Sequence, residues 1–226
     1  METIELKEWI GLRGKLYADD NLIDPSTRVE GYKKLIGNLS VKTVLEVGCN
    51  RGHNLAAIST LGDYELHGID PCEYAIDIAR KSVPNAKFTT ADAFSIPYPD
   101  SYFDLVFTTG VLMHIASRDL PLARAEMCRV SKMHILVIEY DLSSSIPGVG
   151  KDPEWDVALR LGDIEYLVYR NYGYAFSGFG EPHIEPPIET VGTPSGPWLA
   201  CMSDGPVDEN FGNEKLHYWL FTKYIF

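Results

Sequence analysis

The sequence lacks any long apolar run. No stretch approaches 18 consecutive apolar residues, the length at which a run predicts a membrane-spanning helix. The first residues, Met1-Glu-Thr-Ile-Glu-Leu-Lys-Glu, are acidic and mixed, which is not the composition of a signal peptide. We therefore expect a cytoplasmic protein with no membrane partner.

Cysteine is scarce. The four cysteines, Cys49, Cys72, Cys128 and Cys201, lie far apart and form no CxxC pair. This spacing suits neither a structural zinc site nor a disulfide framework, so we expect reduced thiols. No other grouping of His, Cys, Asp and Glu has metal-ligand spacing, and we predict no metal. The sequence also has no GxSxG elbow, so nothing indicates hydrolysis by a nucleophilic serine.

Positive charge is in the minority. The 226-residue chain has 32 acidic and 20 basic residues, a formal charge of -12 and a pI near 4.9. A surface of this sign repels a phosphate backbone, and no basic stripe interleaved with aromatic residues is present. We therefore expect no nucleic-acid partner, although a local basic pocket for one carboxylate or phosphate is compatible with the total.

What the sequence does contain is an alternation of short apolar runs and helical patterns. We expect strands at 43–47, 65–69, 86–89, 103–108 and 133–140, and helices at 53–61, 73–82 and 119–131. Strands alternating with helices predict an α/β, Rossmann-like, doubly wound fold. We expect a mostly parallel, seven-stranded sheet with helices on both faces.

The length and the 45% of apolar residues suit one large domain, so we expect 1–226 to fold as a single unit. Its predicted parts are N-terminal helices in 1–40, a cofactor-binding core in 40–140, a substrate or lid segment in 141–213 and a terminal strand in 214–226. The helices of the first part are predicted at 5–17 and 26–38, and a further helix at 154–170. The terminal strand is expected to be antiparallel. Residues 177–213 hold most of the Gly and Pro, and loops of this length are usually functional.

The most informative segment is a glycine-rich turn after the first strand, Val44-Leu-Glu-Val-Gly-Cys-Asn-Arg-Gly-His-Asn. Gly48 and Gly52 let the backbone approach a ligand closely. The next strand ends at Asp70, where a carboxylate can accept both ribose hydroxyls of an adenosine. These features suit NAD as well, but Asn50 stands where a GxGxxG turn has its second glycine, which disfavours a pyrophosphate. The alternative is a strand–helix connection without a ligand.

A third segment, Thr90-Ala-Asp-Ala-Phe-Ser-Ile-Pro-Tyr-Pro, follows the third predicted strand. Asp92 can accept the amino group of an adenine, while Ala93 and Phe94 offer a backbone donor and a ring contact. Taken alone, Asp92 is more often a turn or helix-capping residue.

These segments resemble the class I S-adenosylmethionine-dependent methyltransferases. VLEVGCNRGHN is similar to the first motif of that family, LHGID to its ribose-binding strand, and ADAFSIPYPDSYFDLVF to its adenine loop and fourth strand. The resemblance covers residues 40–140 and implies S-adenosylmethionine as the cofactor. The cofactor-binding residues that it implies are Glu46, Gly48, Asn50, Gly52, Asp70, Asp92, Ala93, Phe94, Thr109 and Gly110.

The resemblance also implies a role for each part of this set. The turn at Gly48, Asn50 and Gly52 meets the methionine portion, Asp70 the ribose and Asp92 the adenine. Glu46 supports the turn and helps to hold the methionine ammonium group through water. Thr109 and Gly110 line the side of the sulfonium and the acceptor.

A narrower resemblance concerns the acceptor. TTGVLMHIASRDLPLARAEMCRVSKMHILVIEYD is similar to methylases associated with pseudaminic acid and related amino-sugar pathways, and Tyr17 and the aromatic segment 166–171 fit this grouping in part. The Gly- and Pro-rich residues 177–213 depart from it. The resemblance implies a small polar acceptor, such as a sugar or an amino sugar.

Three residues are candidates for catalysis. His114 follows the fourth strand, where doubly wound folds bind ligands, and its imidazole can act as a general base. It can equally be a structural residue that caps the next segment. Glu139 and Tyr140 end the fifth strand on the same edge of the sheet, where they can orient the acceptor or lie in solvent.

The aromatic cluster around Tyr169 and Arg170 is the candidate substrate wall, together with Tyr17. Arg170 can hold a carboxylate or phosphate with two parallel hydrogen bonds. A helix packed on the sheet explains the same cluster without a substrate.

We predict methyl transfer from S-adenosylmethionine to an oxygen or nitrogen atom of a small-molecule acceptor, by a monomer or homodimer. The alternatives are an NAD(P)-dependent reductase and a non-catalytic, methyltransferase-like subunit of a complex. The departure from GxGxxG and the Asp92 loop disfavour the first, and the complete set of Gly48, Gly52, Asp70 and Asp92 disfavours the second.

Overall fold

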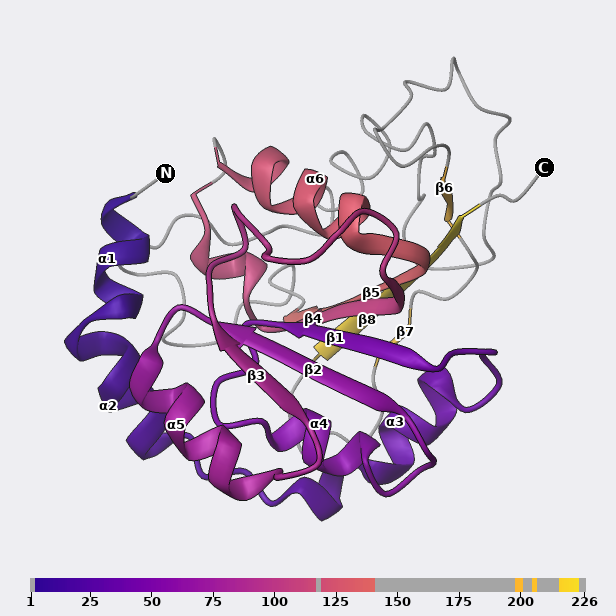
Figure 1. Ribbon diagram of the computed structural model, residues 1–226, viewed down its shortest axis with the longest axis horizontal. Helices are drawn as coiled ribbons and strands as arrows, with labels where there is room; N and C mark the ends of the chain where they lie inside the picture. Colours follow the sequence, from indigo (N-terminus) through magenta and orange to yellow (C-terminus); the bar gives the residue numbers. More distant parts are fainter. Residues whose placement is uncertain (1–2, 117–118, 141–197, 201–204, 207–215, 224–226) are drawn as a thin grey trace.

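The computed structural model describes residues 3–116, 119–140, 198–200, 205–206 and 216–223 (Figure 1). Its centre is a sheet of five parallel strands in the order β3-β2-β1-β4-β5. These strands are β1 (Thr43–Val47), β2 (Glu65–Asp70), β3 (Lys87–Thr90), β4 (Phe103–Thr109) and β5 (Ser131–Tyr140). The chain reverses direction across the sheet between β1 and β4, which pair in parallel. The predicted Rossmann-like, mostly parallel α/β fold is confirmed.

Strand β8 (Leu216–Lys223) extends the sheet beyond β5 in the antiparallel direction. The two strands pair from His134 opposite Thr222 to Tyr140 opposite Leu216. Two short strands, β6 (Trp198–Ala200) and β7 (Gly205–Pro206), pair with β8. The predicted antiparallel terminal strand is therefore confirmed, whereas the predicted count of seven strands is not.

Helices cover both faces of the sheet (Figure 1). On one face lie α3 (Val29–Ile36), α4 (His53–Ile58) and α5 (Glu73–Ser82), and on the other lies α6 (Leu120–Val130). The strands supply both cores by alternation, since successive side chains of a strand point to opposite faces. Val44 packs in the cluster with α3, α4 and α5, and its neighbour Leu45 packs in the cluster with α6.

The N-terminal region differs from its prediction. Two helices, α1 (Ile4–Ile10) and α2 (Leu12–Asp20), replace the single helix expected at 5–17. The break falls at Gly11, whose ψ of -140° is not helical and whose N–H donates to the carbonyls of Lys7 and Glu8. A glycine loses little by leaving the helical conformation, and the chain turns there.

The helix predicted at 26–38 is also divided. It begins as a 3-10 turn, η1 (Pro25–Arg28), and continues as α3. Asp24 caps the turn by accepting a hydrogen bond from the N–H of Ser26, at 2.9 Å.

Three cysteines of the described part, Cys49, Cys72 and Cys128, are buried and form no disulfide with one another. No helix in the described ranges combines the length and apolarity needed to cross a membrane. The helix predicted at 154–170 and most of the predicted substrate segment 141–213 lie outside the described residues.

Candidate cofactor-binding site

A cavity of about 490 Å³ lies at the carboxyl ends of β1, β2 and β4, with α1 and α2 along one wall. Small-molecule sites are usually concavities of this size, and doubly wound folds bind ligands at this edge of the sheet. The predicted cofactor residues in its lining are Glu46, Gly48, Asn50, Asp70, Asp92, Ala93, Phe94, Thr109 and Gly110, and the candidates Tyr17 and His114 line it too.

The turn after β1 has the backbone that its glycines predict. Gly48, Asn50 and Gly52 have φ values of 76°, 45° and 78°, in the left-handed region that favours glycine. A Cβ atom at Gly48 would collide with the side chain of Val111. Gly52 does not line the cavity, and a Cβ atom there would lie 3.0 Å from the ring of Phe88. Gly52 therefore shapes the turn from behind.

Asp70 joins this turn to the next one. Its Oδ2 accepts a hydrogen bond from the N–H of Asn50, and its Oδ1 accepts one from the N–H of Cys72, both at 2.9 Å. Burial raises the pKa of the Asp70 carboxyl to about 6, against the lowering effect of these two hydrogen bonds. Each carboxylate oxygen retains acceptor capacity for a ligand hydroxyl.

Glu46 is a buried carboxyl in the middle of the site, only 1% exposed. Its Oε1 accepts a hydrogen bond from Nδ2 of Asn54 at 2.6 Å. Within the described residues its Oε2 has no hydrogen-bond partner, and neither do Oδ1 and Nδ2 of Asn50 or Oδ1 of Asn54. Burial raises the pKa of Glu46 to about 8. Unpartnered buried polar atoms are costly, and a polar ligand or water in the cavity would satisfy them.

Arg28 is a residue of the cavity wall that the motifs did not reveal. It is the last residue of η1, is 5% exposed, and lies near enough to Glu46 to lower the pKa of that carboxyl. No glycine or carboxylate pattern marks it in the sequence. The sequence analysis indicated only that a local basic pocket is compatible with the acidic net charge, without pointing to Arg28.

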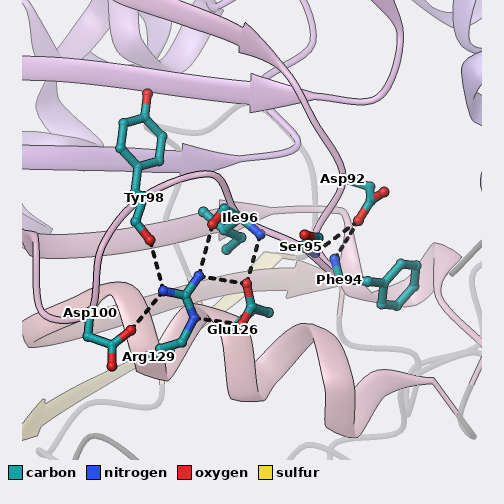
Figure 2. Close-up of polar contacts among 8 residues, drawn as sticks. All are labelled: Asp92, Phe94, Ser95, Ile96, Tyr98, Asp100, Glu126 and Arg129. Carbon is teal, nitrogen blue, oxygen red and sulfur yellow. Dashed lines mark hydrogen bonds and ion pairs between the residues drawn. The ribbon is translucent and has the colours of Figure 1, made fainter.

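The loop after β3 presents Asp92. Its Oδ1 accepts hydrogen bonds from the N–H groups of Phe94, at 2.8 Å, and Ser95, at 3.1 Å, which forms a tight side-chain turn (Figure 2). No hydrogen bond from another described residue reaches Oδ2. The N–H of Phe94 is thus already used, so the backbone donor that we expected from Ala93 and Phe94 can come only from Ala93.

The loop after β4 places His114 against an aromatic wall. His114 ends a short 3-10 turn, η2 (Leu112–His114), and its ring lies 4.7 Å from that of Trp9. Tyr17 meets Trp9 edge-on at 5.4 Å, so α1 and α2 bring both rings to the cavity. Burial, together with the positive charge of Arg13, lowers the pKa of His114 to about 4. His114 is therefore neutral at pH 7.

The remaining predicted site residues are placed less fully. Glu139 and Tyr140 end β5, opposite His217 and Leu216 of β8, and only their backbone is described. Tyr169 and Arg170 lie outside the described residues. In the described ranges, no three His, Cys, Asp or Glu side chains gather as metal ligands would.

The centre of the chain is similar to a known protein family. Residues 44–134 match the family described as a methyltransferase domain. The matched residues run from β1 into β5 and make up about two fifths of the chain. Among the solved structures with a similar fold, one contains bound SAM and another is in complex with SAH.

The chain is similar to two curated methyltransferases over part of its length. It is 32% identical to an O-methyltransferase of Pyrenophora dematioidea over 33% of this chain and 30% of that protein. It is 30% identical to the 27-O-demethylrifamycin SV methyltransferase of Amycolatopsis mediterranei over 45% of this chain and 41% of that protein. The chain thus spans less than half the length of these relatives.

Two solved structures share the fold. The PH0226 protein of Pyrococcus horikoshii has a TM-score of 0.66 and 17% identity, over 95% of this chain and all of that one. A SAM dependent methyltransferase of Aquifex aeolicus has a TM-score of 0.61 and 14% identity over the same shares.

Proposed function

We propose that this chain transfers the methyl group of S-adenosylmethionine to an oxygen or nitrogen atom of a small molecule. The observation that carries the proposal is the unpartnered, buried Oε2 of Glu46 in the cavity that Asp70 and Asp92 also line. A cofactor that joins an amino acid to an adenosine has an ammonium group, ribose hydroxyls and an adenine amino group. These donors can bond to the carboxyl groups of Glu46, Asp70 and Asp92.

The methionine half of the cofactor fits one end of this arrangement. Glu46 Oε2 would accept a hydrogen bond from the ammonium group, directly or through water. Arg28 would bind the carboxylate of the methionine portion, because Arg28 and Glu46 line the same cavity. A guanidinium binds a carboxylate with two parallel hydrogen bonds. Gly48 and Asn50 would lie along the methionine side chain of the cofactor. Thr109 and Gly110 would lie near its sulfonium.

The adenosine half fits the other end. Asp70 would accept the two ribose hydroxyls, and Oδ2 of Asp92 would accept the adenine amino group. The N–H of Ala93 would donate to the ring, and Phe94 would contact its face. A dinucleotide fits less well, because the N–H of Asn50 is already bonded to Asp70 and cannot hold a pyrophosphate.

The bound donor supplies a methyl carbon on a positively charged sulfur, so the residues of this chain mainly orient the acceptor and exclude water. Orientation of this kind can lower a barrier by roughly 7–11 kcal/mol. His114 lies at the cavity, where it would take a proton from an acceptor hydroxyl or ammonium, but its pKa of about 4 makes it a weaker base than the ordinary imidazole that we expected. A general base adds about 10²–10⁴-fold to the rate.

The acceptor lies beside the wall formed by Trp9, Tyr17 and His114 in this proposal. The O-methyltransferase relatives favour oxygen as the methylated atom. A small polar metabolite, with sugars and amino sugars as the first group to screen, stays our prediction, as do the roles of Glu139, Tyr140, Tyr169 and Arg170. The charge of -12 disfavours a nucleic-acid partner, and a cytoplasmic monomer or homodimer stays our prediction.

The first experiment is calorimetric titration with S-adenosylmethionine, S-adenosylhomocysteine and NADH in parallel. We expect micromolar binding of the first two and none of NADH, and Asp70→Ala should abolish binding while the protein remains folded. Binding of NADH alone would replace the proposal with a reductase. Binding of none of the three would favour a non-catalytic subunit.

A further inference from the structure

The loop that carries Asp92 is bonded to a helix that does not line the cavity, in addition to the contact of its Tyr98 hydroxyl with His67 of β2 at 3.0 Å. This loop runs from Ala91 to Tyr102, between β3 and β4, and α6 packs beside it (Figure 2). The two side chains that hold it, Glu126 and Arg129, are one helical turn apart on α6. Neither was singled out by the sequence motifs.

Arg129 uses its whole guanidinium group. Nε and Nη2 donate to the two carboxylate oxygens of Glu126, at 2.7 and 2.8 Å. Nη2 also donates to the carbonyl of Ile96 at 2.9 Å, and Nη1 to the carbonyl of Tyr98 at 2.8 Å and to Asp100 at 2.9 Å. These contacts account for all five N–H donors of the side chain.

Glu126 completes the clamp. Its Oε2 accepts the N–H of Ile96 at 2.8 Å, so both main-chain groups of Ile96 are bonded to the Glu126–Arg129 pair. At the far end of the loop, the N–H of Ser101 donates to the carbonyl of Arg129 and the N–H of Tyr102 donates to the carbonyl of Val130. These two main-chain bonds also attach the loop to the end of α6. Glu126 and Arg129 are only 21% and 24% exposed, which limits screening of the pair by solvent.

The clamp meets the Asp92 turn directly. That turn closes on the N–H of Ser95, and the next residue is the clamped Ile96. Ile96 is also buried, at 3% exposed, so its backbone is held by both packing and hydrogen bonds. The orientation of Asp92 Oδ2 therefore depends on where α6 holds the chain four residues later.

We propose that Glu126 and Arg129 are positioning residues that set the selectivity of the site for an adenine base. The inference rests on the proposed function, in which Asp92 accepts the adenine amino group. A hypoxanthine base places a carbonyl oxygen where adenine has its amino group, opposite the carboxylate, and it should be rejected only while Asp92 is held in position. The pair acts through the loop and touches neither cofactor nor acceptor.

The test compares binding of S-adenosylhomocysteine with that of S-inosylhomocysteine, its hypoxanthine analogue, by calorimetry. We expect the unaltered protein to prefer the adenine ligand by about 10- to 100-fold, the worth of one hydrogen bond to a charged group. Arg129→Lys keeps the charge but lacks the planar fork. It should lower the affinity for S-adenosylhomocysteine about tenfold, with little loss for the analogue, so that the preference falls toward one.

A second variant and two controls guard against a change in folding. Glu126→Gln places an amide donor among the N–H groups of Ile96 and Arg129, and it should reduce the preference in the same way. Asp100→Asn alters the 69% exposed arm of the network and should leave the preference unchanged. Arg80→Lys is the matched control, because Arg80 also pairs with an i-3 carboxylate and bonds a main-chain carbonyl, yet lies outside the loop.

The outcomes separate the two proposals. If the unaltered protein binds neither ligand, the proposed function fails. If it prefers the adenine ligand but Arg129→Lys and Glu126→Gln keep that preference, the positioning role is wrong. An equal loss for both ligands in the two variants, with a lower melting temperature, would also overturn it, because the pair would then be stabilising the fold alone.

Discussion

Single residues of the cavity carry ionisable groups whose pKa values burial has shifted. The pKa of Glu46 is raised to about 8 and that of Asp70 to about 6, whereas the pKa of His114 is lowered to about 4. In each case burial disfavours the charged form, and no nearby charge fully compensates for it. Groups of this kind cost stability in the empty protein and are typical of functional sites.

Glu46→Gln should therefore stabilise the empty protein in a pH-dependent way. With an unfolded pKa near 4.5 and a folded pKa of about 8, Glu46 takes up a proton on folding between these values. Stability is then lost as pH rises from about 4.5 to about 8. The variant should gain little at pH 4 and a few kcal/mol at pH 8, measured as the difference in urea unfolding between variant and parent.

The same substitution should weaken binding of S-adenosylhomocysteine, because an amide replaces the acceptor for its ammonium group. We expect a loss of about tenfold or more. A variant that is more stable at pH 8 but binds unchanged would remove Glu46 from the site. A gain that does not vary with pH would contradict its raised pKa.

His114→Asn should lower kcat by about 10²-fold, the low end of the contribution of a general base, because a pKa of about 4 makes His114 a weak base. It should leave S-adenosylhomocysteine affinity unchanged, since His114 is assigned to the acceptor. Because its pKa is about 4, the imidazole stays neutral, and kcat of the parent should lose no rate through this residue between pH 7 and pH 5.5. Steady-state rates at saturating substrates measure both. His134→Asn, another buried histidine but at the amino end of β5, is the control.

At the scale of elements, hydrophobic pattern predicted most of what the structure describes. The helix expected at 73–82 is α5 with the same bounds, and β1 also has its predicted bounds. Strands buried on both faces give continuous apolar runs, and Gly and Asp at their ends mark the turns. The helical spacing of the apolar residues continued across Gly11, so it predicted one helix at 5–17, whereas the glycine ends α1 and starts α2.

The site was predictable to a similar degree and for a related reason. Asp70 ends β2 and Asp92 follows β3, so topology alone brings them to one edge of the sheet. Arg28 and Trp9 reach the same cavity from the N-terminal helices, and no strand end marks them. The hydrogen-bond clamp of Arg129 needs the three-dimensional placement of α6 on the loop, so it could not be read from spacing.

Gly14→Ala tests the fit of α2 over the cavity. A Cβ atom at position 14 would collide with the main-chain oxygen of Trp9 and lie 3.1 Å from Cβ of Cys72. We expect a loss of about 1–3 kcal/mol from overpacking, together with weaker ligand binding, because α1 and α2 must move from the cavity wall. Gly62→Ala is the control, since its new atom meets only the ring of Tyr64, at 3.2 Å, and should change stability by about 0.5 kcal/mol or less. Equal effects of the two substitutions would contradict the tight packing at Gly14.

For the molecule as a whole, ligand binding should appear as a rise in melting temperature. A hundredfold excess of S-adenosylhomocysteine over Kd stabilises the folded state by about 2.7 kcal/mol. For a chain of this length we expect a shift of roughly 5–10 °C. Differential scanning calorimetry measures it, and Asp70→Ala should show no shift. A similar shift with NADH would contradict the cofactor assignment.

The pairing of β5 with β8 has a consequence for synthesis on the ribosome. Residues 43–140 complete the parallel strands, but Leu216 and its neighbours can pair with β5 only after residues 141–215 have been made. At about 5–20 residues per second this takes roughly 4–15 s, during which the edge of β5 has no β8 beside it. Unpaired strand edges promote aggregation, so nascent chains should depend on chaperones most strongly in this interval.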